Sequence, residues 1–259
     1  MVKFLKDRWE EYGFLLQELV KRDFKKKYKK TALGMLWSLL NPLLRILVMY
    51  LVFSVFFGNE TPHFLIHVFS GQMIFGFFSN GTNSGMTSLV GNAELITKVK
   101  VPKYIFLFSK NAASTIEFFT TLIIFFVFVW AEGIAFTPRM FLLIYPVTTL
   151  LIFNIGVGLI LSAVFVFFKD TQYLYSVFLQ LLMFMSAIFW PVERFSYSTQ
   201  RLFMINPIFA HIHYFRLVVI HNITPSVNVH LLLFGNALLA LAVGSFFYKK
   251  YSYKFVYYI

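Results

Sequence analysis

Residues that could bind ATP or a catalytic metal are few and scattered in this chain of 259 residues. Its three aspartates, Asp7, Asp23 and Asp170, are far apart, so no D-x-D pair is available for a metal–nucleotide complex. The phosphate-binding pattern G-x-x-x-x-G-K-S/T does not occur. We therefore expect no cofactor site in this chain, and no ATP binding through a phosphate loop.

Two histidine pairs are the nearest approach to a metal site. His63 and His67 are four residues apart and share one face of a helix, whereas His211 and His213 are two apart and diverge. Two imidazoles without a third ligand make a poor zinc site. We expect the first pair to lie at a membrane interface, and we predict no metal site.

Three ionisable residues in apolar stretches are more informative, because a charge at membrane depth is costly. Arg45 has two interpretations: contact with an anionic phosphate, or a long side chain that extends to the headgroups. Lys110 and Glu117 are seven residues apart and share a helix face. We expect them to form an ion pair within or between spans, and a transport role is the alternative.

Aromatic residues are the remaining candidates, with 35 Phe, 14 Tyr and 4 Trp. Near span ends, Trp and Tyr usually form interfacial belts. Aromatic rings also stack on the C–H faces of sugars, so a substrate path lined by Trp37, Tyr50 and Trp190 is the second interpretation.

The composition excludes an ordinary soluble domain. Hydrophobic residues make up 59% of the chain and charged residues 13%, against about 25% charged in soluble domains. Apolar blocks of about 20 residues are typical of bilayer spans. We predict an all-α integral membrane protein, a single domain over residues 1–259 with six spans, at 36–57, 64–89, 104–131, 140–168, 172–190 and 229–248.

Two further segments are expected to lie at the membrane surfaces. Residues 7–30 have apolar residues at helical spacing, which predicts an amphipathic interface helix. Residues 191–227 are too polar to span, yet they contain apolar pieces around Asn206 and Pro207. We predict two short helices that enter the outer leaflet, because irregular backbone there must be buried in protein or line a wet cavity.

Basic residues set the predicted orientation. Of the 23 lysines and arginines, 18 lie in segments on the side of the N-terminus and four on the opposite side. Ten fall in residues 1–30, beside the first span, so anionic lipid headgroups rather than nucleic acid are the expected counter-charge. We predict that both termini are cytoplasmic.

The order of motifs resembles one family. The run from Arg22 to Pro42 resembles the start of the permease subunit of type-two ABC exporters, where R-D-x-K-x-R-Y-K leads into L-G-x-L-W-x-x-x-x-P. Residues 92–102 resemble its N-x-x-L-I-x-K-x-x-x-P loop, and Asn206-Pro207 with Arg216 resembles its N-P-x-x-x-x-x-x-x-x-R motif. The resemblance covers nearly the whole chain and is closest to the branch that exports O-antigen, teichoic acid and capsule.

Two departures from the family pattern are visible. Lys169 stands where the family commonly has Arg before an Asp, and the leader is unusually rich in lysine. Neither departure affects the expected architecture. The family places carbohydrate-reading domains, when present, on the ATPase chain, so polymer choice is not readable in this sequence.

The resemblance implies roles for particular residues. The leader helix, with Arg22 and Asp23, would meet an ATPase subunit. The coupling segment 91–102 would dock on that subunit through Asn92, Glu94, Leu95, Lys98 and Pro102. Residues 191–227 would form outer gate helices, with Pro191, Asn206, Pro207 and Arg216.

The implied function is that of the permease half of an exporter for undecaprenyl-diphosphate-linked polysaccharide in the bacterial inner membrane. A homodimer would work with two copies of a nucleotide-binding subunit, which would hold ATP and Mg²⁺. One alternative is a type-two exporter for a drug or another lipid. Another is an integral membrane transferase, but such enzymes need clustered carboxylates or histidines, which this sequence lacks.

Overall fold

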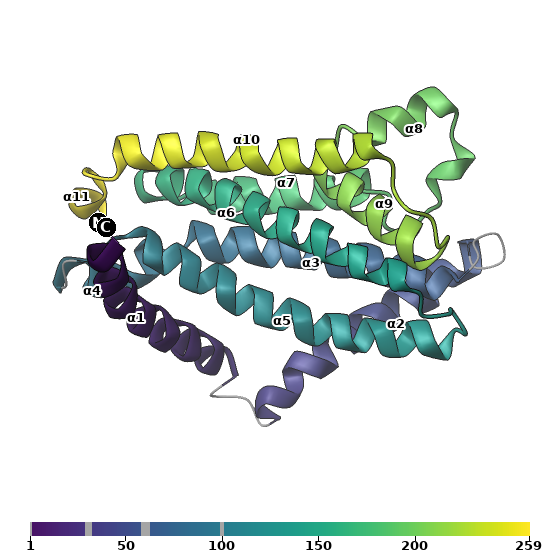
Figure 1. Ribbon diagram of the computed structural model, residues 1–259, viewed down its shortest axis with the longest axis horizontal. Coiled ribbons are helices and arrows are strands. Elements are labelled where there is room, and N and C mark those ends of the chain that lie inside the picture. Colours follow the sequence, from purple (N-terminus) through teal and green to yellow (C-terminus); the bar gives the residue numbers. More distant parts are fainter. Residues whose placement is uncertain (1, 29–32, 58–62, 99–100) are drawn as a thin grey trace.

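Every regular element in the described part of the chain is a helix, as predicted (Figure 1). The computed structural model describes residues 2–28, 33–57, 63–98 and 101–259. Residues 29–30 of the expected interface helix and 99–100 of the expected coupling segment lie outside this part.

The helices differ widely in length. The longer ones are α1 (Val2–Tyr28), α2 (Trp37–Phe57), α3 (Phe64–Met86), α5 (Tyr104–Ala131), α6 (Ile144–Phe167), α7 (Thr171–Met185), α9 (Pro207–Val219) and α10 (Val227–Tyr251). The shorter ones are η1 (Gly34–Leu36), η2 (Val90–Asn92), α4 (Ala93–Lys98), η3 (Pro138–Leu143), η4 (Val192–Arg194), α8 (Tyr197–Phe203) and α11 (Phe255–Tyr258).

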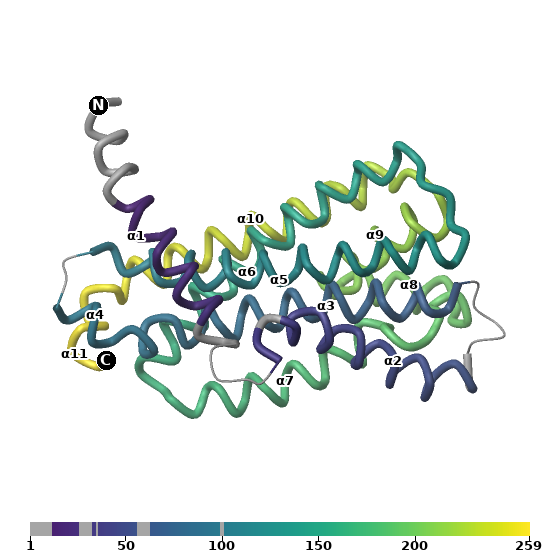
Figure 2. Tube along the Cα trace, turned by 90° about the horizontal axis from the view of Figure 1, so that it is seen from below, coloured from purple at the N-terminus to yellow at the C-terminus, as the bar shows by residue number. Residues whose placement is uncertain are grey.

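α3, α5, α6, α7 and α10 run side by side along the molecule (Figure 1). α6 packs against α3, α5 and α10, and α2 packs against α3 and α5. α1, α4 and α11 gather at one end, called here the α4 end, and α8 and α9 lie toward the other, called the α8 end. Figure 2 shows α1 crossing the bundle at an angle near the α4 end, where it packs against α5.

Small residues bring the central helices together. Gly156 of α6 lies against the backbone of Ala240 of α10, and Gly244 lies against Gly156, with no room for a Cβ atom on either glycine. A Cβ on Gly85 of α3 would lie 3.2 Å from the Cα of Gly158. Small residues let helix backbones approach closely in membrane proteins, so these contacts fix α3, α6 and α10 as the centre of the bundle.

Four helical segments are long and apolar enough to cross a membrane, which makes this a multi-pass membrane protein. They are Trp37–Val55, Tyr104–Ala131, Pro138–Phe167 and Val227–Tyr251. A fifth candidate is the pair α8 and α9, which is bent by 111°. The described residues therefore contain four to five such segments, against the six spans expected.

α3 and α7 are not among these segments, because α3 is not apolar enough and α7 is too short. The second half of α3 is polar, from Ser79 to Gly85. α7 has 15 residues and is therefore about 22 Å long, shorter than a hydrocarbon core of about 30 Å.

Candidate functional site

A network of charged side chains ties α1 to the bundle at the α4 end. Arg22 donates from Nη2 to Oδ1 of Asn92 at 2.7 Å and contacts Oδ1 of Asp23 at 2.8 Å. The Asp23 side chain is buried, and its Oδ2 lies 3.1 Å from Nζ of Lys110 on α5. One carboxylate thus faces two cations, and together they join α1 to α5 and to the segment that precedes α4.

The partner of Lys110 differs from the simplest expectation. Lys110 was expected to form an ion pair with Glu117 or with another span, but its partner is Asp23 of α1. Glu117 instead lines a cavity between α2, α3 and α5. Their spacing placed the two residues on one helix face, but a contact with α1 decided the partner of Lys110.

Asn92 connects the charged network to the turn before α4. Its Nδ2 donates to the carbonyl of Ser88 at 2.7 Å, while its Oδ1 accepts from Arg22. Both ends of the buried amide are therefore satisfied, which fixes the direction in which α4 leaves the bundle.

α4 presents an exposed surface at this end of the molecule. Ile96 anchors it to the core at 8% exposure, whereas Glu94, Leu95 and Lys98 are exposed. Glu94 is in the first turn and Lys98 in the last turn, the arrangement that the helix dipole favours. Of the residues expected to contact an ATPase, Glu94, Leu95 and Lys98 are thus on the outside of the molecule, whereas Asn92 and the Asp23 side chain are buried.

The chain returns to the bundle at Pro102. Its carbonyl accepts from the N–H of Ile105 at 3.1 Å at the start of α5. Lys103 donates from Nζ to the carbonyl of Ser252 at 2.6 Å, which joins this segment to the end of α10. Partial burial lowers the pKa of Lys103.

A cavity of about 270 Å³ lies between α2, α3 and α5, and Trp37 and Arg45 both line it. Nε of Arg45 donates to Oδ1 of Asn41, one turn earlier, at 3.2 Å. The other helices add polar side chains, namely Gln72, Asn80, Ser114, Glu117 and Thr121, and three aromatic rings, namely Phe69, Phe77 and Phe118. Such a mixed lining can contact both a phosphate and a sugar ring.

Tyr50 and Trp190 lie elsewhere and are not among the described residues that line this cavity. Tyr50 is farther along α2, and its ring centroid is 6.4 Å from that of Phe64. Trp190 follows α7 and packs on Phe189, with centroids 6.3 Å apart. Phe53 of α2 stacks on Phe189 at 4.3 Å. The residues expected to line one substrate path therefore fall into two groups: Trp37 and Arg45 at the cavity, and Tyr50 and Trp190 away from it.

At the α8 end, Asn206 caps α9 and ties it to the end of α7. Its Oδ1 accepts from the N–H of Ile208 at 2.9 Å, with Pro207 at the first helical position. Its Nδ2 donates to Oγ of Ser186 at 3.0 Å and to the carbonyl of Met185 at 3.2 Å. A single amide therefore holds the α8–α9 junction against α7.

Arg216 fixes the other end of the same helix. Its guanidinium is 5% exposed and donates to three carbonyl groups, those of Ala187 at 3.0 Å, His67 at 3.0 Å and Ile188 at 3.1 Å. These bonds join α9 to α3 and to the segment after α7. Among the described residues no carboxylate lies within ion-pair distance of Arg216, so carbonyl dipoles stabilise the cation.

The backbone of two neighbouring segments makes room for the Arg216 side chain. A Cβ on Gly71 of α3 would lie 2.9 Å from Cγ2 of Ile188 and 3.2 Å from Nη2 of Arg216. Ala187 has a φ of +45°, in the left-handed region that is costly for a residue with a Cβ. Pro191 follows, buried, just before η4. Sequence reasoning did not single out Gly71 or Ala187, whose importance comes from a tertiary contact.

Three histidines form hydrogen bonds that join separate helices or segments. His211 is buried, and its Nε2 lies 3.2 Å from Oγ1 of Thr149 on α6. Nε2 of His230 on α10 lies 2.9 Å from the hydroxyl of Tyr214 on α9. Nδ1 of His63 lies 3.3 Å from Oε2 of Glu132. Within the described ranges no three His, Cys, Asp or Glu residues are close enough to hold a metal.

Comparison with known proteins agrees with this architecture. The family model described as ABC-2 type transporter matches residues 15–220. The O-antigen export system permease protein RfbA of Myxococcus xanthus is 28% identical over 79% of this chain and 78% of its own length. A Klebsiella pneumoniae protein of the same name is 24% identical over 93% of each chain. The polysialic acid transport protein KpsM of Escherichia coli is 25% identical over 69% of this chain and 70% of its own. Since the family model covers well over half of the sequence, this chain belongs to the ABC-2 type transporter family.

Proposed function

We propose that this chain is the permease subunit of an exporter that moves a lipid-linked polysaccharide across the bacterial inner membrane. One observation carries the proposal: the similarity to an O-antigen export permease extends over 93% of both chains. A relative named for polysialic acid transport points to the same class of cargo. The carrier we propose is undecaprenyl diphosphate, whose diphosphate is a compact anion for a cationic site.

Energy comes from a separate ATPase subunit, two copies of which bind a permease homodimer. The absence of a phosphate-loop motif from the sequence supports this division. The docking surface is the exposed part of α4, with Glu94, Leu95 and Lys98. The network of Arg22 and Asp23 then transmits a push on α4 to α1 and α5.

Six spans cross the membrane, with both termini in the cytoplasm. α3 and α7 join the four apolar helices because they run alongside them (Figure 1). α3 needs little apolar surface of its own, because neighbouring helices bury most of it. The α4 end carries α1 and the lysine-rich end of α10, so the excess of positive charge on the cytoplasmic side supports this orientation.

The homodimer covers two apolar surfaces that a single chain leaves open. Only 6% of the spanning window of α2 is buried. α7 exposes a row of large apolar side chains, namely Leu174, Val177, Phe178 and Leu181. A second copy related by two-fold symmetry encloses a path between these helices.

Within this path, Arg45 binds the diphosphate at the inner leaflet and Trp37 stacks on the first sugars. Tyr50 and Trp190 continue the path toward the α8 end. There the α8–α9 hairpin is the outer gate, held by Asn206 and Arg216. A channel that passes many repeats must bind each one weakly, and aromatic stacking meets that requirement.

Measuring ATP hydrolysis tests this proposal. The permease is purified alone and with its proposed ATPase subunit, and both preparations are placed in the same lipid. We expect no hydrolysis by the permease alone, and stronger stimulation of the complex by lipid-linked polymer than by undecaprenyl diphosphate. Hydrolysis by the permease alone contradicts the proposal, as does stimulation by drugs but not by polymer.

A further inference from the structure

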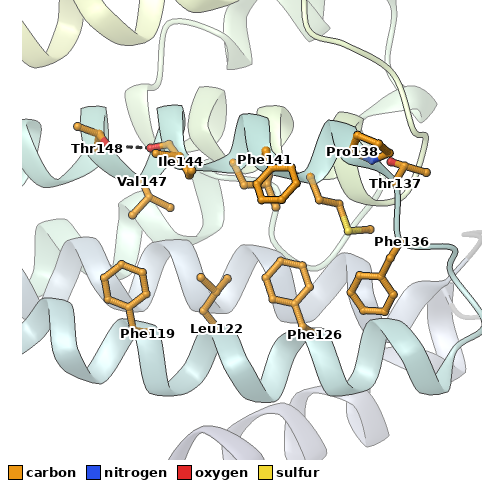
Figure 3. A pocket seen from close by; sticks show the side chains of 12 residues that line it. Phe119, Leu122, Phe126, Phe136, Thr137, Pro138, Phe141, Ile144, Val147 and Thr148 are labelled. Atoms are coloured by element: carbon orange, nitrogen blue, oxygen red, sulfur yellow. Dashed lines mark hydrogen bonds between the residues drawn. The ribbon is translucent and has the colours of Figure 1, made fainter.

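A second cavity, called here the α5–α6 slot, encloses about 650 Å³ between α5 and the η3–α6 segment. One wall is formed by three side chains of α5, namely Phe119, Leu122 and Phe126. The facing wall is formed by Phe141, Ile144 and Val147 (Figure 3). Both walls are apolar along their length, so the slot suits hydrocarbon rather than sugar.

The slot opens sideways, and the α5–α6 connection lies at one end, called here the connection end. Phe119 is 50% exposed and Phe141 is 77% exposed, so its side lies open at the protein surface. Phe136 and Pro138 line the connection end, where the ring of Phe126 lies 6.0 Å from that of Phe136. Both long helices are apolar enough to span a membrane, so the open side faces lipid.

The depth of the slot matches one leaflet. From Phe119 to Phe126 the α5 wall rises about 10 Å, and half of a hydrocarbon core is about 15 Å. The slot therefore starts near the membrane surface and follows one leaflet through most of its depth. One extended chain fits such a shape better than a compact molecule does.

A cationic side chain lies beside the connection end. Thr137, which lines this end, donates to Oδ1 of Asn222 at 2.9 Å, and Arg139 donates from Nη1 to the carbonyl of Asn222 at 2.7 Å. Arg139 is exposed. The acidic Glu132 of the same connection contacts His63. A phosphate just beyond the connection end would meet the remaining N–H groups of the guanidinium.

We infer that the α5–α6 slot binds one phospholipid of the leaflet at the α8 end, with an acyl chain between the two walls and its phosphate at Arg139. The inference depends on membrane insertion alone and not on the proposed cargo. It assigns α5 and α6 a lipid-binding role separate from the cavity of Arg45.

Photo-crosslinking in nanodiscs tests the inference. The permease is reconstituted with phosphatidylglycerol that carries a diazirine on an acyl chain, and labelled peptides are mapped by mass spectrometry. Leu122→Trp fills the slot, and Ile123→Trp is its control, because Ile123 is 69% exposed and does not line it. Wild type and Ile123→Trp should be labelled on both walls. In Leu122→Trp that labelling should be about tenfold lower, because the Trp side chain occupies the slot.

The headgroup contact has its own variants. Arg139→Ala should lower labelling about fivefold, since one cationic side chain near an anionic surface contributes about 1 kcal/mol. Arg139→Lys should retain most of it. Val147→Trp, on the facing wall, repeats the filling test if Leu122→Trp does not fold.

Two results would overturn the inference. Equal labelling in the slot-filling variants and in Ile123→Trp means that the label reports ordinary surrounding lipid. Displacement of the label by polyprenyl phosphate, but not by unlabelled phosphatidylglycerol, identifies the carrier lipid as the occupant.

Discussion

Arg216 shows how a single cation can organise a membrane segment. A charge at membrane depth is costly unless it is compensated, and here three backbone carbonyls from two separate segments supply that compensation. The side chain thus sets the position of α9 relative to α3. Its role is architectural first, and any role in gating depends on it.

Arg216→Ala should therefore destabilise the permease by about 3–5 kcal/mol, since three buried carbonyls lose their donor. Arg216→Lys should be intermediate, because an ammonium cannot reproduce the planar fork. The matched control is Arg201→Ala, because Arg201 is exposed and stacks on Tyr197. Thermal unfolding in detergent measures all three. If Arg216→Ala unfolds at the same temperature as Arg201→Ala, the stabilising role assigned to the three Arg216 hydrogen bonds is wrong.

Arg45 gives a second prediction, this time about substrate. If it binds the diphosphate, Arg45→Ala loses one charge-assisted contact of about 1.5–3 kcal/mol. The KM for lipid-linked polymer in the ATPase assay should then rise about tenfold to a hundredfold, with Arg45→Lys closer to wild type. If Arg45 only extends to the headgroups, KM stays constant and only the amount of inserted protein falls.

At the scale of elements, the contact between α1 and α5 is the main feature that the sequence did not predict. Asp23 and Lys110 are far apart in sequence, and neither residue's local pattern indicates the other. Their pairing places α1 in direct contact with α5. Motion of α1 can therefore reach α5 without passing through a flexible loop.

A double-mutant cycle tests this connection. Asp23→Ala and Lys110→Ala should show a coupling energy in stability of about 0.5–3 kcal/mol, and each should lower polymer export per ATP hydrolysed. The exposed pair Glu18 and Lys21, 2.8 Å apart on the same helix, is the control. Its coupling should be near zero. If the effects of Asp23→Ala and Lys110→Ala on stability are additive, and export per ATP stays normal, the ion pair does not connect α1 to α5 functionally.

Sequence patterns predicted the helices better than the contacts between them. Apolar runs predicted helices where α2, α5, α6 and α10 lie because span length is a local property. Short helices on either side of Asn206-Pro207 were also predicted, because their apolar runs are local. The Ala187 turn and the Gly71 contact depend on which helices pack together, and no local pattern encodes that.

At the scale of the whole molecule, the two ends have different chemistry. The α4 end holds the charged network and an exposed short helix, whereas the α8 end holds a bent helix pair and a buried arginine. Between them lies a bundle joined through small residues. Such an arrangement suits a protein that receives a mechanical input at one surface and opens a path at the other.

Translocation itself is the most direct test of the central claim. The permease and its ATPase are reconstituted in liposomes with undecaprenyl-diphosphate-linked polymer on the side of the ATPase. A lectin on the other side then detects polymer that has crossed. The account predicts crossing that needs ATP and both subunits, and that Arg45→Ala slows. Polymer that never crosses in the intact complex, while the complex transports another class of substrate, would contradict it.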